Sequence, residues 1–465
     1  MESKGVSSPT RKYTFDSLLF FKIASTLMIL CVLSMSLFRD FDHDEFEAVH
    51  TAWKILTGEV IYIDFFQHHH PFFYYLIIPF IKLIGEKALT LLILRLFIFS
   101  FFLGILRISY LLIKDIFDSN RIAWLAILLL VSTSMFSQKV IEIRPDVPQV
   151  FFGLLAILFY LRNFKGDSRN SLHLSAFFMA ISFLFLQKTL FIIAGLGLTQ
   201  LYHLYIKELS IKKLTVYWSV FILGICPYYL YLSFTDQILS YLFWNWTLNM
   251  NFAGSFSPFN TLIDSFFLNQ FIWLFYFVGL VVFFRHQKTL ILLSLLLLAS
   301  IFLVQAPYRQ YFMPFVPFMC GISAAAMLRV LNEKQTKIIV ALTVLVPMIY
   351  SIRSIIVYPN KPELQKIDWV LDQTEPRDHI YDGDIYFNLY RKDIDFFWYS
   401  TDPKKGGLVT YKKLRNYDYN IYEAINKHRP KIISALFIED MNRPGIKENY
   451  FQSEDYPDLY IRKNN

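Results

Sequence analysis

The sequence predicts an all-α polytopic membrane protein with about eleven transmembrane helices, followed by a small C-terminal α/β domain. Hydrophobic residues make up 55% of its 465 residues and include 48 Phe, which is too apolar for a soluble globular protein. They gather in runs of about 20 residues, the length that a helix needs to cross ~30 Å of hydrocarbon. The composition changes near Tyr358, after which 108 residues carry 35 of the 82 charged residues and no run could span.

Eleven apolar runs fill most of the first 357 residues. The first run is long enough to span and lacks a small-residue cleavage site, so we interpret it as an anchor and not as a removed signal peptide. Cys31, Cys226 and Cys320 lie inside runs, where packing is the simplest use of a thiol. The runs are 18–38, 88–113, 121–137, 147–162, 171–189, 190–206, 214–233, 267–284, 289–304, 310–329 and 338–357.

The distribution of Lys and Arg predicts the orientation. Alternate short loops hold 16 of these residues, whereas the opposite loops hold 8 although they are longer in total. Because cytoplasmic loops carry the excess of positive charge, we expect the N-terminus in the cytoplasm and the protein in the cell (inner) membrane. The loop 39–87, which follows the first span, is then outside, and an odd number of spans places the C-terminus outside as well. The net charge of +8 therefore reflects topology and gives no reason to invoke nucleic acid.

The chain is expected to divide into a membrane domain, residues 1–357, and an outer domain, residues 358–465. In the outer domain "KPELQKIDWVLDQT" and "NIYEAINKHR" have helical periodicity, whereas "HIYDGDIYF" and "KIISALFIED" resemble strands. Alternating helices and strands predict an α/β fold. At 108 residues this region can bury a modest core of its own.

The loop 39–87 is expected to contain two helices. Phe46, Val49, Trp53 and Leu56 fall on one helical face, and Gly58 stands where such a helix would stop. A second piece, "PFFYYLIIPFIKLIG", is too short to span. We expect both helices to lie in the outer membrane interface, with Trp and Tyr at the depth of the headgroups.

Carboxylates gather at the start of this loop: Asp40, Asp42, Asp44, Glu45 and Glu47. Asp42 and Glu45 have the spacing of a capping box, and capping alone would account for these two. It leaves Asp44 as a surplus carboxylate, which the positive end of a helix would keep ionised and able to accept a proton.

Three consecutive histidines, His68, His69 and His70, follow in the same loop. Three neighbours cannot all point at one ion from a regular helix or strand, so a dedicated metal site is disfavoured. Contact with an anionic headgroup, or a surface position without a role, remains open for them.

Cations are expected at the outer mouth of the helices. Arg144 and Asp146 lie within about one turn of a predicted bilayer boundary, where charge is costly unless it is paired or used, although a polar loop whose prolines start a helix would also explain them. Snorkelling would explain Lys188 or Arg309 alone. With His69 these cations would face the acids. Cations for a phosphate and an acid for a proton are the groups that a transfer reaction on a lipid-linked phosphate needs.

The ordered motifs resemble the GT-C superfamily of integral-membrane glycosyltransferases, especially the bacterial branch related to protein O-mannosyltransferases and lipid A aminoarabinose transferases. Each motif is short, and their order, spacing and predicted sidedness carry the resemblance over nearly the whole chain. The segment "DHDEFEAVHTAWKILTGEVIYIDFFQHHHPFFYYL" is similar to the family's first outer loop, "EIRPDVPQVFFGLLAI" to its second loop and "QKTLFIIAGL" to its next outer corner. The segment "RQYFMPFVPFMCGISA" resembles a late helix, and "RPKIISALFIED" with "YPDLYIRKN" resembles the terminal domain.

The resemblance implies transfer of a sugar from a polyprenyl-phosphate carrier to a glycan, lipid or protein acceptor on the outer face. It implies that Asp44 is the catalytic base, that Glu45 supports it and that Asp146 is a second acid. His69 stands where the family often has Lys, and its charge depends on pH. The residues implied to hold the donor phosphate are Arg144, Lys188, Arg309 and His69. Supporting positions are Asp42, His68 and Tyr308. Asp42 and Asp44 could also hold a divalent metal, as in some distant relatives, although the resemblance implies that none is required.

A transporter or flippase is the main alternative from another class. Transporters usually place ionisable groups near the midplane, on broken helices and often in repeated halves. Here the acids lie in predicted outer loops, no repeat is visible and the chain has only 16 Gly. A non-catalytic scaffold whose outer domain binds a partner is a further alternative. The sequence does not predict the sugar, the acceptor or the stereochemical outcome.

Overall fold

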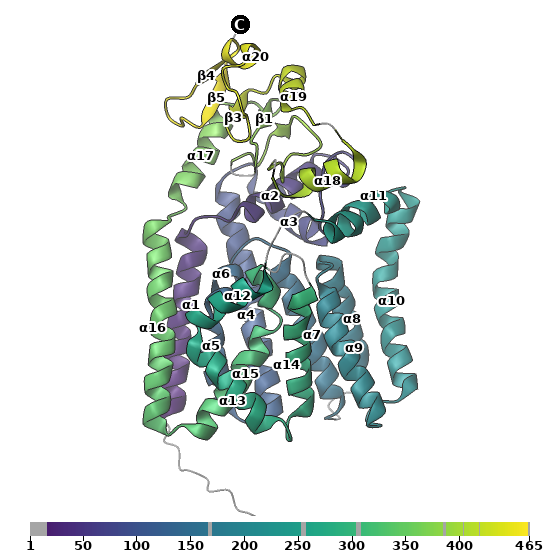
Figure 1. Cartoon of the computed structure of the whole chain (residues 1–465), viewed down its shortest axis with the longest axis vertical. Coiled ribbons are helices and arrows are strands. Elements are labelled where there is room, and N and C mark those ends of the chain that lie inside the picture. The colour runs from purple at the N-terminus through teal and green to yellow at the C-terminus, as the bar shows by residue number, and fades with distance from the viewer. Residues whose placement is uncertain are drawn as a thin grey trace, which may run out of the picture.

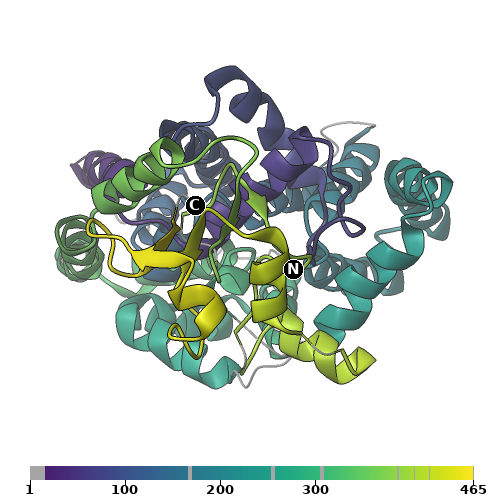
Figure 2. The same ribbon diagram turned by 90° about the horizontal axis from the view of Figure 1, so that it is seen from above.

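The computed structural model describes residues 16–165, 170–252, 257–303, 308–384, 387–402, 404–417 and 419–463. It consists of two stacked parts: a bundle of upright helices and, at one end, a small sheet with short helices (Figure 1). We call the end of the bundle that carries the sheet the sheet end. Figure 2 looks down on it and shows the C-terminal segments lying over the middle of the bundle.

A helix corresponds to each of the eleven predicted runs. These helices are α1 (Asp16–Phe38), α4 (Leu89–Phe117), α5 (Asn120–Val131), α7 (Asp146–Asn163), α8 (Ser171–Phe185), α9 (Thr189–Tyr205), α10 (Ile211–Phe234), α13 (Gln270–Phe283), α14 (Lys288–Ser300), α15 (Val316–Val330) and α16 (Glu333–Val357). The shorter helical elements are α6 (Ser134–Lys139), α11 (Ile238–Leu242), α12 (Pro258–Leu268), the π-helix η1 (Phe243–Leu248), and the 3₁₀ turns η2 (Ile301–Leu303) and η3 (Arg309–Phe312).

The number of full spans stays a prediction. In the described parts of the chain, α1, α4, α10 and α16 are long and apolar enough to cross a membrane, and α12 with α13, bent by 104°, would make a fifth span. The 12 residues of α5 extend only ~18 Å, short of the ~30 Å hydrocarbon layer. Apolar composition therefore predicted where helices form better than how far each extends.

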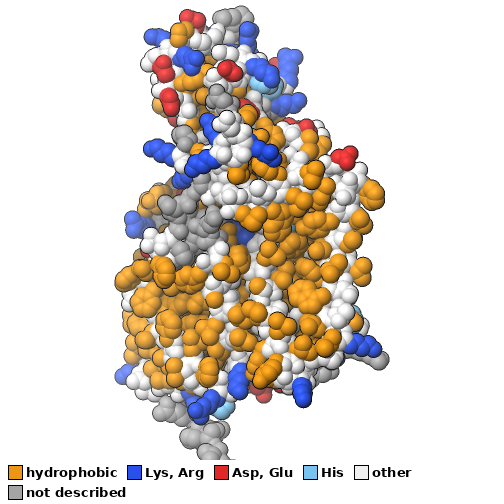
Figure 3. All heavy atoms as spheres, turned by 45° about the vertical axis from the view of Figure 1, so that its right-hand side comes forward, with side chains coloured by type: hydrophobic (Ala, Val, Ile, Leu, Met, Phe, Trp, Pro, Cys, Tyr) orange, Lys and Arg blue, Asp and Glu red, His pale blue; other side chains and the backbone are white. Residues whose placement is uncertain are grey.

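The flank of the bundle is apolar. Leu223 of α10, Val281 of α13 and Ile356 of α16 each expose more than two thirds of their surface. Figure 3 shows one side of the bundle, where hydrophobic side chains cover the surface between two ends that carry Lys and Arg. An apolar surface of this extent suits contact with lipid tails and not with water.

The two predicted helices of the first loop are present as α2 (His43–Leu56) and α3 (Phe72–Ile84). Gly58, with φ +99°, follows the end of α2 as expected. The expectation that α2 lies in the membrane interface is wrong, because its residues from Glu45 to Lys54 are all buried. The C-terminal part covers α2, so both faces of this helix are inside the protein (Figure 1).

The C-terminal part contains a five-stranded mixed sheet in the order β2-β1-β3-β5-β4. The predicted helices and strands are confirmed as α17 (Lys361–Asp372), β1 (His379–Tyr381), α19 (Ile421–His428) and β3 (Ile432–Ser434). β1 is parallel to β2 and β3, and β5 is antiparallel to β3 and β4. The division into two domains at residue 357 stays a prediction. The remaining elements are β2 (Lys392–Asp393), α18 (Gly407–Arg415), α20 (Pro444–Lys447), β4 (Tyr450–Gln452) and β5 (Leu459–Arg462).

Buried charges attach the C-terminal part to α2. An Asp393 carboxylate oxygen lies 2.9 Å from His50 Nε2 and 2.7 Å from Lys54 Nζ, and all three side chains are at least nine-tenths buried. The Trp398 indole donates to the carbonyl of Phe66 at 2.8 Å. Breaking a buried pair leaves an unpaired charge, so these contacts fix the C-terminal part on the first loop.

Candidate active site

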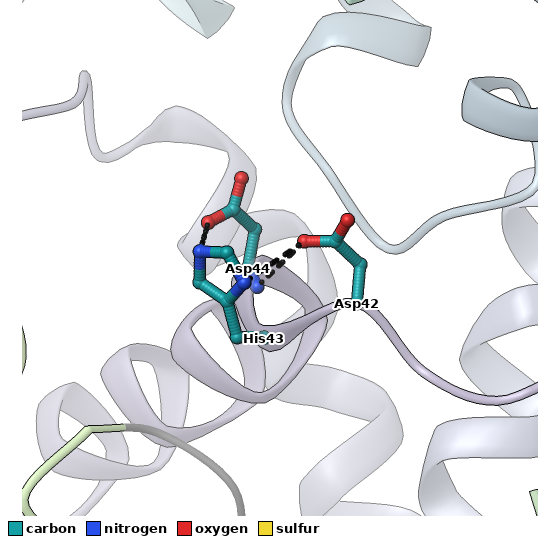
Figure 4. A group of neighbouring side chains, drawn as sticks. All are labelled: Asp42, His43 and Asp44. Atoms are coloured by element: carbon teal, nitrogen blue, oxygen red, sulfur yellow. Dashed lines mark hydrogen bonds and ion pairs between the residues drawn. The ribbon is translucent and has the colours of Figure 1, made fainter.

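The start of α2 carries a compact group of side chains. Asp42 is the N-cap, and with Glu45 it forms the predicted capping box. The His43 ring lies beside both aspartates, with Nε2 3.1 Å from Asp44 and Nδ1 3.5 Å from Asp42 (Figure 4). The charge of Asp44 raises the pKa of His43 to about 9 against the effect of burial. His43 is therefore a cation at neutral pH.

Glu45 is fully buried, and both oxygens of its carboxylate accept hydrogen bonds. Arg95 of α4 donates to both oxygens, at 2.8 Å and 2.5 Å. The backbone amides of Asp42 and Ile143 donate to the same carboxylate at 2.9 Å and 3.0 Å. Glu45 therefore holds the start of α2 against the loop before α7, and any support that it gives to Asp44 acts through position.

Arg95 was missed in the sequence because it stands inside a predicted span. Besides Glu45, its guanidinium donates to the carbonyls of Arg39 and Asp40, both at 2.6 Å, and lies 3.8 Å from the centre of the Phe41 ring. The only sequence signal for Arg95 is a charge within an apolar run, which marks a paired group.

Arg144 stands at the centre of the acids. Its Nη1 lies 2.5 Å from Asp44, 3.4 Å from Glu142 and 3.6 Å from Asp42. Burial opposes charge on both partners, yet their attraction holds the pKa of Arg144 well above its usual value and, together with His43, the pKa of Asp44 well below. Asp44 exposes 35% of its side chain whereas Arg144 exposes 7%. The carboxylate therefore faces the accessible side of the pair.

Two further cations extend this arrangement. Lys139 Nζ lies 2.8 Å from Asp42 and 2.9 Å from Glu142. On the other side, Asp146 lies 3.5 Å from Arg144 Nε and 3.0 Å from Lys188 Nζ. The loops around α2, α6–α7 and α8–α9 thus bring acids and bases into one continuous series of ion pairs. We call it the charge chain, and it consists of Lys139, Asp42, Glu142, Arg144, Asp44, Asp146 and Lys188.

Arg309 and Tyr308 lie beside the charge chain at the start of η3. Arg309 donates to Gln138 Oε1 at 3.0 Å, and the Gln138 carbonyl accepts a hydrogen bond from Arg39. Burial and the charge of Asp44 raise the pKa of Tyr308. Tyr308 is thus close to Asp44, whereas Arg309 is hydrogen-bonded to the side-chain amide of Gln138.

The three consecutive histidines have different environments. His70 is buried, with Nδ1 2.8 Å from the Phe183 carbonyl and Nε2 2.9 Å from the Tyr241 hydroxyl. Burial lowers the pKa of His68 to about 4 and that of His69 well below its usual value. The imidazoles of His68 and His69 are therefore neutral, and His69 is not one of the cations that the sequence predicted at the outer mouth of the helices. Its buried Nδ1 has no hydrogen-bond partner among the described residues.

A polar network behind the charge chain was also missed. Gln67 accepts hydrogen bonds from the backbone amides of His68 and His69 and from the Tyr399 hydroxyl, and it donates to Glu47. Tyr399 belongs to the C-terminal part, and its hydroxyl also lies 2.9 Å from His68 Nδ1. Burial, with the charge of Asp44, raises the pKa of Glu47 to about 7. Glu47 was visible as the fifth acid of the loop, but its burial was not.

The possible metal ligands do not fit a resident metal ion. Asp42, His43 and Asp44 each offer an atom within 4.8 Å of the others. Their carboxylates already contact Lys139 and Arg144, at 2.8 Å and 2.5 Å. A divalent cation would have to displace both groups and would be repelled by their charges. We therefore derive no chemical step through a metal.

Comparisons with known proteins agree with this architecture. The family model for dolichyl-phosphate-mannose-protein mannosyltransferase matches residues 68–226, about a third of the chain. A search of curated proteins found no match to the sequence.

Several solved structures share the fold at low sequence identity. ArnT from Cupriavidus metallidurans bound to undecaprenyl phosphate is 16% identical, with a TM-score of 0.55 over 69% of this chain and 62% of that chain. The same enzyme in the apo state is 13% identical, with a TM-score of 0.59 over 80% and 84%. The apo oligosaccharyltransferase of Archaeoglobus fulgidus is 13% identical, with a TM-score of 0.59 over 97% and 74%.

The match thus spans less than two thirds of the undecaprenyl-phosphate-bound ArnT. At these identities the likeness shows the fold, and the family model adds the relationship in sequence. Together they confirm the resemblance drawn from the ordered motifs. Residues 68–226 thus resemble the protein mannosyltransferase family in sequence, and the chain shares its fold with ArnT.

Proposed function

We propose that this protein is a glycosyltransferase that moves a hexose or pentose from a polyprenyl-phosphate carrier to a glycan, lipid or protein acceptor. The observation that carries the proposal is the charge chain, in which the partly exposed Asp44 stands among buried cations where the helical bundle meets the sheet. Relatives whose structures hold undecaprenyl phosphate or dolichol phosphate support the lipid-linked donor.

In this proposal Asp44 takes the proton of the acceptor hydroxyl as that oxygen attacks the anomeric carbon. The new oxygen–carbon bond forms while the bond from carbon to the phosphate oxygen breaks, and the phosphate leaves on its carrier. Arg144 and Lys188 stabilise the charge that gathers on this leaving group, with Arg309 and the neutral imidazole of His69 as further donors. Asp146 holds Lys188 and orients the sugar.

Arg144 couples the arrival of the donor to the strength of the base. Without a phosphate, Arg144 pairs with Asp44 at 2.5 Å and holds the pKa of that carboxyl down. A phosphate offers the guanidinium a charged, bidentate partner. When Arg144 turns to the phosphate, Asp44 loses the cation that suppresses its basicity and becomes a better proton acceptor.

The apolar flank and the loop charges support a location in the cell (inner) membrane, with the sheet end on the extracytoplasmic side. The carrier's hydrocarbon would stay in the bilayer beside the exposed side chains of α10 and α16. Its phosphate would reach the charge chain at the sheet end, where an acceptor from the aqueous side can meet the sugar.

The experiment that tests the proposal is transfer by purified protein in nanodiscs. Radiolabelled polyprenyl-phosphate sugars serve as donors and membrane extract as the acceptor source, with and without EDTA. We expect label to move from one donor into a new product, and EDTA to change the rate by less than about twofold because the acids are paired with cations. Abolition by EDTA would overturn the metal-free mechanism. Translocation of donors across the membrane of proteoliposomes, without any transfer, would favour the flippase.

The substitution Tyr399→Phe should slow transfer by about tenfold, because it removes the hydroxyl that orients Gln67 and His68. Tyr411→Phe is the matched control, since Tyr411 packs on Trp244 at 5.1 Å in the same C-terminal part. The measurement is the transfer rate alongside the melting temperature. Equal effects of the two substitutions would show that Tyr399 contributes packing alone.

A further inference from the structure

A small cavity lies beneath the pair formed by Asp146 and Lys188. Its volume of about 20 Å³ leaves room for one water-sized group. Phe191 and Ile192 of α9 and Leu297 of α14 form part of its apolar lining, whereas its polar lining comes mostly from α7 and from the segment around η3. The lining residues that matter for its chemistry are Asp146, Gln149, Lys188, Gln310 and Tyr311.

Gln149 is the residue of this cavity whose side-chain amide is not fully hydrogen-bonded by the described residues. Its side chain is 2% exposed, and the amide nitrogen Nε2 has no hydrogen-bond partner among the described residues. It stands one helical turn after Asp146, so both side chains lie on the same face of α7. A buried amide without a partner is costly, and a ligand group that accepts a hydrogen bond at this place would complete its bonding.

The carboxylate of Asp146 decides which kind of ligand group fits. Its oxygens contact Lys188 and Arg144 at 3.0 Å and 3.5 Å and retain lone pairs for a further donor. A phosphate oxygen cannot donate to a carboxylate and would be repelled by it. A hydroxyl can donate to Asp146 and accept from Gln149 Nε2 at once. The volume also suits one hydroxyl better than a whole phosphate group.

We propose that this cavity binds one hydroxyl of the donor sugar, and that Gln149 is a specificity-determining residue that selects sugars carrying it. The proposal rests on the glycosyltransferase function proposed above. The sugar would then lie next to Lys188. Because the donor phosphate would also contact Lys188, this lysine would lie where the phosphate is bonded to the sugar. Phe191 and Leu297 contribute apolar lining, and a volume of about 20 Å³ leaves no room for a second polar group.

The test compares wild type with Gln149→Met, which keeps the length of the side chain and removes the amide. Gln200→Met is the matched control, because Gln200 is also buried but lies about 18 Å along α9 from Lys188. Donors are polyprenyl-phosphate sugars and their singly deoxygenated analogues. Donor retention by the protein in nanodiscs is measured by native mass spectrometry, and transfer is measured as kcat/KM.

We expect Gln149→Met to lower retention and kcat/KM for the preferred donor about tenfold, and Gln200→Met to change neither. One deoxy analogue should be at least about tenfold poorer than the parent donor for wild type, and this penalty should be smaller for Gln149→Met, because that variant has already lost one of the two hydrogen bonds that the hydroxyl makes. Equal losses for every analogue would overturn the proposal in favour of a structural role for Gln149.

Unchanged retention in Gln149→Met would also overturn the proposal and leave the cavity to a trapped water. These failures are distinct from failure of the proposed function, which would appear as wild-type protein that neither retains nor transfers any donor. Retention does not require turnover, so it decides the role of Gln149 even with an acceptor that reacts slowly.

Discussion

The substitution Asp44→Asn should reduce the transfer rate by about 10²–10⁴-fold, the contribution typical of a general base. Asparagine keeps the size of the side chain and can still accept a hydrogen bond from Arg144 or His43, so the local structure should persist. What it cannot do is take the proton of the acceptor hydroxyl. The rate is measured with saturating donor, and the melting temperature is recorded for the same samples.

Asp40→Asn is the matched control for this result. Asp40 is four residues earlier, exposes 45% of its side chain and contacts Arg39 at 3.5 Å, so its loss should change the rate less than twofold. Full activity of Asp44→Asn would contradict its assignment as the base. Glu47→Gln and Asp146→Asn would then be the next variants, Glu47 because its pKa of about 7 suits proton transfer at neutral pH.

The substitution Arg95→Met should lower the free energy of unfolding by about 3–5 kcal/mol, because it leaves Glu45 as an unpaired buried carboxylate. Both side chains are fully buried, so water cannot replace the lost partner. Equilibrium unfolding in mixed detergent micelles with increasing SDS measures the change. The start of α2 should loosen as well, and transfer should fall with it.

Arg107→Met is the control, because Arg107 is exposed on the same helix. The double variant Glu45→Gln with Arg95→Met should recover part of the lost stability, since the neutral amide no longer carries an unpaired charge. A drop of less than about 1 kcal/mol for Arg95→Met would mean that Glu45 is stabilised by the amides of Asp42 and Ile143 without the guanidinium.

Local patterns predicted the elements whose causes are local. The capping box of Asp42 and Glu45, the stop at Gly58 and the helical face of α2 all depend on residues within one or two turns, and each is confirmed. The strands β2, β4 and β5 have two to four residues, too few to establish a period of two. They form because neighbouring strands offer edges to pair with: β2 pairs with β1, β5 with β3, and β4 with β5.

The site could be predicted only as a set of candidate charges. Asp44, Arg144, Asp146 and Lys188 were selected individually from the sequence, and the structure brings them into one charge chain. Which of them pair, and how strongly, depends on burial. Tyr399 carried no sequence signal at all, because only the packing of the C-terminal part places it beside His68.

Burial also changed the expected chemistry of single groups. A histidine read from the sequence can be neutral or charged, and desolvation makes the imidazole of His69 neutral here. Burial acts in the same direction on Glu47 by favouring the uncharged acid. Such shifts come from the density of surrounding atoms, which no run of residue types specifies.

The docking of the C-terminal part on α2 sets the order in which the protein can mature. His50 and Asp393, which meet at 2.9 Å, are separated by 343 positions in the chain. At about 5–20 residues per second, a ribosome needs on the order of tens of seconds to pass from one to the other. Throughout that interval α2 has emerged without its cover, with Lys54 and His50 lacking the carboxylate that they bind in the finished protein. The C-terminal part can therefore cover α2 only after Asp393 has been translated.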